Sequence, residues 1–385
     1  MPPARSLLSL AILYAGSSAM LRICDPMLLQ LSRDFDVTMG RAALTVYTFA
    51  IAFGLLQLVF GPLGDRWGKR RVIGVCGLGC VIGNLLALVA WSLDALVVAR
   101  VVAGITAAGM GPLMLAWLGD TVPYEHRQTV LARFMASSLT GVILGQWVSG
   151  VMTDWFGWRS VFAMLAVLFC VGGLAVLCDP AVRRERGSPS QSGYFQGMGR
   201  VLSLPWPRWI IGFTVAEGTF TFAAMVFLPT FLVREYGLGL STASGVAALY
   251  GIGGFAYSFL ARRLVPRYGE TGMAWRAGIA MAVSWMSIAL VGHWALVVPA
   301  VLVAGLGFYS LHGVLQTHAT QMVPELRGTA VGLFASAMFA GIALGVVAAS
   351  QVVDSGGFRP VFAVCAVALG VLGYAVSVQV GRRGA

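Results

Sequence analysis

The sequence predicts an all-α membrane protein whose twelve transmembrane helices form two six-helix repeats. Of its 385 residues, 58% are hydrophobic and only 11% are charged, whereas soluble domains carry roughly 25% charged residues. Apolar runs of about 20 residues, the length of helix that crosses a bilayer, recur along the whole chain. The second half also repeats residues of the first half at an offset near 200. Such a chain has too little polar surface to face water, so we expect it to lie in the lipid bilayer.

Twelve apolar runs are long enough to span the membrane, and several end in tryptophan, which favours the membrane interface. They lie near residues 7–30, 43–60, 72–91, 95–118, 130–152, 159–178, 208–233, 241–261, 274–292, 295–319, 328–352 and 360–381. The first run follows Arg5 and contains small residues at 15–19, an order that secretory signals also have. Cleavage there would remove half of the first helix and break the repeat, so we expect a span.

Four matches in the same order indicate two copies of one six-helix unit. Residues 157–162 recur as residues 357–362, and the glycines at 141 and 145 recur at 341 and 345. Residues 63, 66 and 68 match residues 264, 267 and 269, and the Val-Pro pair at 122 recurs at 323. Matches that keep one order and one spacing point to duplication rather than chance.

The longest polar segment separates the first six spans from the last six, as expected of a linker between two halves. We therefore expect an N-terminal six-helix bundle over residues 1–178, a cytoplasmic linker over residues 179–207 and a C-terminal six-helix bundle over residues 208–385.

The basic residues predict the orientation. Nineteen Lys and Arg residues fall on the side of both termini and five on the opposite side. Because cytoplasmic loops of membrane proteins are enriched in Lys and Arg, we expect both termini to be cytoplasmic, in the cell (inner) membrane.

Composition also argues against other classes of partner. The net charge is +11, but anionic lipid at a cytoplasmic face accounts for this excess. No basic run is interleaved with a soluble fold, so nucleic-acid binding is not expected. The six cysteines form no CxxC pair and no cluster with histidine, so we expect neither a disulfide framework nor a metal site.

One short polar stretch, residues 61–71, holds much of the charge between the second and third spans. Pro62 and its neighbouring glycines are expected to end the second span in a tight loop. Asp65 precedes Lys69 by four residues, a spacing at which opposite charges pair on one helical turn. The stretch is either a connector that obeys the positive-inside rule or a gating element. The candidate gating residues are Gly61, Asp65, Arg66, Gly68, Lys69 and Arg70.

This stretch resembles the signature between the second and third spans of the major facilitator superfamily, which is Gly, three residues, Asp-Arg, one residue, Gly and two basic residues. The duplicated twelve-span chain resembles that superfamily along its whole length, and its drug-proton antiporter branch most. The resemblance implies the major facilitator fold, in which two six-helix bundles rock about a central site. It also implies that Asp120, at the cytoplasmic end of the fourth span, completes a charge network with Asp65 and Lys69. That network would be closed when the cytoplasmic ends of the two halves meet.

The fifth span carries small residues at a spacing that permits close helix packing. They are Gly141, Gly145, Ser149 and Gly150. Antiporters of the family carry Gly-Pro followed by paired small residues in this span, and here Gln146 stands in place of the proline. The direction of transport is therefore left open.

Ionisable side chains inside membrane spans are costly and therefore mark candidate functional sites. Here they fall in spans 1, 4, 7 and 10, which line the central pathway in the family. Arg22 and Asp25 share a helical face and either fix helix packing as an ion pair or orient a substrate. Arg100 stands where the family carries an arginine linked to proton coupling; structural pairing with Asp25 is the alternative.

The second half contributes Glu217, in the seventh span, which has phenylalanine and threonine neighbours one turn away. Such a wall suits amphipathic ligands. No basic residue lies in the same span, so we expect Glu217 to carry the proton, unless it is a neutral acid kept for packing. His312 and Gln316, four residues apart in the tenth span, either donate to a substrate or bond to a neighbouring helix.

These residues favour a secondary transporter, proton-coupled and exporting a small amphipathic or drug-like molecule by alternating access. Proton-coupled uptake of a small metabolite is the alternative. A membrane-embedded enzyme is disfavoured because the histidines and acids show no catalytic arrangement, and a sensor is disfavoured because no loop could hold a soluble domain. We expect a monomer without a cofactor, with a small-molecule substrate, protons and the bilayer as its partners.

Overall fold

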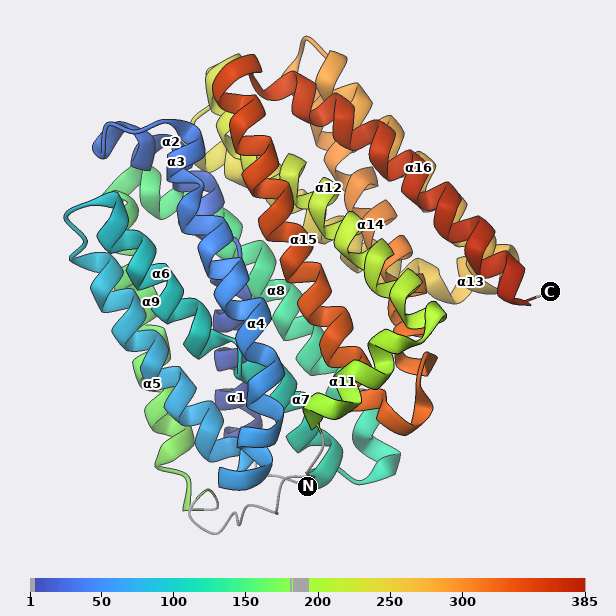
Figure 1. Ribbon diagram of the computed structural model, residues 1–385. Coiled ribbons are helices and arrows are strands. Elements are labelled where there is room, and N and C mark those ends of the chain that lie inside the picture. Colours follow the sequence, from blue (N-terminus) through green and yellow to red (C-terminus); the bar gives the residue numbers. More distant parts are fainter. Residues whose placement is uncertain (1–3, 181, 183–193, 385) are drawn as a thin grey trace. The chain divides into compact units, whose positions relative to one another are not determined.

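The computed structural model describes residues 4–180, 182 and 194–384, and the secondary structure within these residues is entirely helical (Figure 1). Ten helices are each long and apolar enough to cross a membrane, and α1 (Ala4–Ala19) with α2 (Cys24–Asp34) make an eleventh span as a bent pair. The 51-residue α13 (Leu240–Leu290) contains two of the expected spans, joined at the non-helical residue Gly269. The predicted fold class is confirmed.

The described chain forms two compact units. The first comprises Met1–Asp36 with Leu44–Tyr194, and the second comprises Val37–Ala43 with Phe195–Ala385. The boundary at residue 194 falls inside the expected linker, where α11 (Tyr194–Ser203) begins. The short α3 (Met39–Ala42), which the sequence places in the first half, groups with the second unit.

The first unit packs its helices in neighbouring pairs. Helix α1 lies against α8 and α9, and α5 lies against α6 and α9 (Figure 1). The other helices of this unit are α4 (Leu44–Trp67), α5 (Lys69–Leu88), α6 (Leu93–Ala107), α7 (Met110–Thr121), α8 (Tyr124–Phe156) and α9 (Trp158–Leu177). Helices α6 and α7 together make the fourth span.

The second unit repeats this scheme, with α12 against α15 and α13 against α14 and α16. Its bounds are α12 (Pro205–Tyr236), α14 (Val297–Gln321), α15 (Arg327–Gly356) and α16 (Phe358–Gly384), with short 3-10 turns at Trp294–Leu296 and Pro324–Leu326. Main-chain contacts keep the register of the repeat. Glycines 141 and 145 of α8 lie against residues 15 and 19 of α1, and glycines 341 and 345 of α15 lie against residues 215 and 219 of α12.

The expected loop over residues 61–71 is wrong. Helix α4 runs through Pro62 to Trp67, and α5 begins at Lys69. Only Gly68 leaves the helical conformation, with φ of 90°, a region that glycine adopts without steric cost. The ring of a proline clashes with the Cβ of the residue before it. Here that residue is Gly61, which has no Cβ, so this one clash is absent at Pro62.

The first span is present but consists of two helices, because α1 and α2 are bent by 49° at a short break. Pro26 has no main-chain N–H to donate to the carbonyl of Arg22, and the N–H of Asp25 donates to that carbonyl instead, at 3.3 Å. The break frees the carbonyl of Met20 for a hydrogen bond from Arg100, and the carbonyl of Ile23, the N-cap of α2, accepts one from Ser149.

Candidate functional site

The break in the first span is held by Arg100 of α6. Its Nε donates to the carbonyl of Thr45 at 3.0 Å and its Nη2 donates to the carbonyl of Met20 at 2.9 Å. The guanidinium also lies 4.0 Å from the ring centroid of Phe49, and the whole side chain is buried. Arg100 therefore joins α6 to both α4 and the broken first span through main-chain oxygens.

Asp25 lies at the start of α2 and is completely buried. Its carboxylate pairs with Arg22, whose Nη1 lies 3.1 Å from Oδ2. A buried charge needs such a partner, because its desolvation costs on the order of several kcal/mol. The sequence left open whether Asp25 pairs with Arg22 or with Arg100, and among the described residues its ion pair is with Arg22.

The fifth span, within α8, closes the break from another side. Ser149 Oγ donates to the carbonyl of Ile23 at 2.5 Å, and Gly141 and Gly145 bring the backbone of α8 close to that of α1. Gly150 is buried beside them. The small residues of this span thus do two things: they allow close packing and they supply a hydroxyl to the broken helix.

In the second unit, Glu217 of α12 meets His312 of α14. Glu217 is completely buried, and its Oε2 lies 2.9 Å from His312 Nδ1 with hydrogen-bond geometry. The imidazole is flanked by the rings of Phe308 and Phe334, with centroids at 5.4 Å and 5.2 Å. Sequence reasoning missed this pair because the two residues are 95 positions apart, although both had been singled out as intramembrane titratable groups.

Three polar groups of the described chain near this pair make no hydrogen bond to it. Within the described residues, Glu217 Oε1 and the hydroxyl of Thr221, one turn further along α12, have no hydrogen-bond partner. Gln316, one turn from His312 on α14, is exposed. The buried acid therefore keeps one oxygen available as an acceptor next to a hydroxyl and several aromatic rings, a combination that suits an amphipathic ligand.

At the other candidate site, Lys69 begins α5 and contacts two acids of the first unit. Its Nζ lies 3.2 Å from Asp65 Oδ1 and also pairs with Asp120 at the end of α7. The carboxylates are 47% and 61% exposed, so each pair by itself contributes only about 0 to 1 kcal/mol. The three side chains tie the end of α4 to the start of α5 and to α7.

The neighbouring residues of this stretch have different surroundings. Arg70 is buried, with Nη1 at 3.2 Å from Asp179 Oδ2 and its guanidinium 5.3 Å from the ring centroid of Trp117. Arg66 is exposed, and no described atom lies within 4 Å of a Cβ added at Gly61. The pairing of Arg70 with Asp179, at the far end of the first unit's sequence, had no local signal.

A model of the Major Facilitator Superfamily matches residues 10–341. The uncharacterized MFS-type transporter YybF of Bacillus subtilis is 23% identical over 65% of this chain and 63% of its own length. The chloramphenicol resistance protein of Streptomyces lividans is 26% identical over 75% of this chain and 73% of its own length.

Among solved structures, a bacterial homolog to the human lysosomal transporter Spinster matches with a TM-score of 0.79 and 18% identity, over 99% of this chain and 98% of that one. At that identity the likeness concerns the fold alone. The fold and the family match together define a multi-pass membrane transporter rather than an enzyme. The chain belongs to the Major Facilitator Superfamily.

Proposed function

We propose that this transporter exports small amphipathic molecules in exchange for protons, by alternating access. In this proposal it lies in the cell (inner) membrane with both termini in the cytoplasm. The proposal rests chiefly on the buried pair of Glu217 and His312. A carboxylic acid and an imidazole in one hydrogen bond can take up and release a proton with little movement, because both side chains act as acids and bases in proton transfer. Glu217 is the proton carrier in this scheme.

The surroundings of the pair support an amphipathic substrate. Phe308 and Phe334 flank His312, and the free oxygen of Glu217 offers one acceptor to a ligand. The similarity to a protein named for chloramphenicol resistance supports export of a drug-like molecule. In the first unit, we assign a gating role to Asp65, Lys69 and Asp120, and a structural role to Arg100 and the pair of Arg22 and Asp25.

The direction and the coupling are tested together with Hoechst 33342 in inverted membrane vesicles that are acidic inside. A proton-coupled exporter accumulates the dye under this gradient, whereas a proton-coupled importer expels it. Glu217→Gln should abolish movement driven by the gradient while dye binding remains. If the Glu217→Gln variant moves the dye uphill at the wild-type rate, Glu217 is not the carrier and Asp25 becomes the next candidate.

Glu235→Gln is the matched control. Glu235 lies at the end of the same helix, where it is 41% exposed and pairs with Arg359 at 2.8 Å. Its loss should leave the gradient-driven movement unchanged, so a defect confined to Glu217→Gln reports on the buried acid rather than on the charge of α12.

A further inference from the structure

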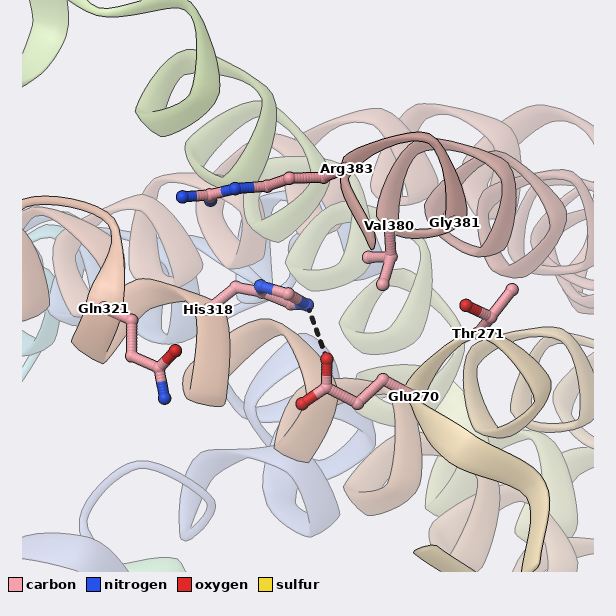
Figure 2. Close-up of a pocket in the computed structure, with 7 residues that line it drawn as sticks. All are labelled: Glu270, Thr271, His318, Gln321, Val380, Gly381 and Arg383. Atoms are coloured by element: carbon pink, nitrogen blue, oxygen red, sulfur yellow. Dashed lines mark ion pairs between the residues drawn. The ribbon is translucent and has the colours of Figure 1, made fainter. Parts of the chain in front are cut away.

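A cavity of about 620 Å³ opens at one end of the second unit, among α13, α14 and α16 (Figure 2). Its polar lining consists of Glu270, Thr271, His318, Gln321 and Arg383. By the distribution of basic residues, this is the end expected to face the cytoplasm. None of these residues takes part in the pair of Glu217 and His312.

The cavity occupies the place that the charged cluster around Lys69 has in the first unit. Gly68 and Gly269 both have positive φ, at 90° and 62°. Each directly precedes a charged residue, Lys69 or Glu270, that pairs with a side chain of another helix. At the offset of 201 that relates these glycines, residues 270, 271, 318 and 321 of the second unit correspond to residues 69, 70, 117 and 120 of the first.

The correspondence exchanges the charges. Glu270 stands at the position of Lys69, and the neutral Gln321 stands at the position of its acidic partner Asp120. A histidine lies one helical turn before Gln321, at position 318. His318 Nε2 lies 3.0 Å from Glu270 Oε2, so the contact between the two helices survives with the acid on the opposite side (Figure 2). Where the first unit uses a lysine and aspartates, the second uses a glutamate and a histidine, the side-chain type whose ordinary pKa lies nearest to neutral pH.

Smaller side chains leave the cavity open beside this pair. In the first unit the buried Arg70 fills the corresponding space and reaches Asp179. In the second unit Thr271 replaces the arginine, and the last turns of α16 contain no acid. Water can therefore reach His318, whose side chain is only 14% exposed but lines the cavity.

We propose that Glu270 and His318 form a second, cytoplasmic proton-binding site, which fastens α13 to α14 when His318 is protonated and releases them when it is neutral. His318 Nε2 and Glu270 Oε2 lie 3.0 Å apart, and protonation of the imidazole turns this contact into an ion pair, which is stronger than a hydrogen bond between neutral groups. The charged groups that face His318 are Glu270 from α13 and Arg383 from α16. The ring of Trp206, from α12, packs edge-on against the imidazole and also carries Arg383 on its face.

Hydrogen exchange of the full-length protein in nanodiscs tests this site without reference to transport. The backbone amide hydrogens of peptides that begin at position 270 should exchange up to about fivefold faster in Glu270→Gln than in the wild type at pH 5.5. At pH 8.5 the two proteins should exchange alike. Comparison at one pH removes the intrinsic pH dependence of exchange. His318→Gln should behave as Glu270→Gln does, which guards against a local fault of one variant.

The double variant Glu270→Lys with His318→Asp copies the charge order of the first unit. Because lysine and aspartate both stay charged over this range, it should protect the same peptides at pH 5.5 and at pH 8.5. Glu235→Gln, at the other end of the unit, serves as the control and should leave these peptides unchanged. An equal ratio of variant to wild-type exchange at the two pH values would overturn the proposal.

Discussion

Arg100→Lys separates a structural role of this arginine from a role in proton coupling. The wild-type guanidinium donates to two carbonyls on different helices and stacks on Phe49. Lysine keeps the charge but has one nitrogen, so it cannot reach both Thr45 and Met20 from the same position. One carbonyl loses a charged donor, at about 1.5 to 3 kcal/mol, and the stacked contact is lost, at about 0.5 to 1 kcal/mol.

We therefore expect the free energy of unfolding to fall by about 2 to 4 kcal/mol in Arg100→Lys. The assay is SDS-driven unfolding of the purified protein in mixed micelles, followed by tryptophan fluorescence. Arg133→Lys is the matched control, because Arg133 is exposed on α8, and its stability should stay within about 0.5 kcal/mol of wild type. An Arg100→Lys protein with wild-type stability and no proton-driven transport would refute the structural assignment and restore the coupling role.

Two further predictions concern the ends of the helices. Asp65→Asn should leave the protein folded and inserted, because a pair this exposed contributes only about 0 to 1 kcal/mol to stability. It should impair dye transport in vesicles, because it removes one partner of Lys69. Transport at the wild-type rate would mean that residues 61–71 are only a connector. Ser190→Cys in a cysteine-free background, at a position outside the described residues, should react with an impermeant thiol reagent only in inverted vesicles, since the basic residues predict a cytoplasmic position for that segment. Labelling of intact cells would contradict the predicted orientation.

The sequence was sufficient for features that depend on composition and spacing. Twelve apolar runs, the repeat near 200 residues and the intramembrane acids are visible without coordinates because membrane burial leaves few polar residues to interpret. The path of α4 through Pro62 was not, because proline was taken as a helix terminator, whereas helices of this chain also continue through Pro229 and Pro266.

The partners of the candidate residues were equally hard to foresee. Glu217 with His312, Arg70 with Asp179 and Glu270 with His318 are contacts between helices remote in sequence. Rotation of each helix about its axis decides such contacts, and an almost uniformly apolar surface gives little information about that rotation. Main-chain acceptors carry no sequence signal at all, which is why the bonds of Arg100 were missed.

The break between α1 and α2 has a consequence for biogenesis. A carbonyl without a donor is costly in hydrocarbon, and the donors for Met20 and Ile23 are Arg100 and Ser149. Both are synthesised long after the first span has left the ribosome. The first span thus enters the bilayer with the Met20 carbonyl lacking a donor in its own helix and without the bond from Ser149 to Ile23, and it reaches its final form only after the fourth and fifth spans have been inserted. Until then it depends on water, on lipid headgroups or on the insertion machinery for those hydrogen bonds.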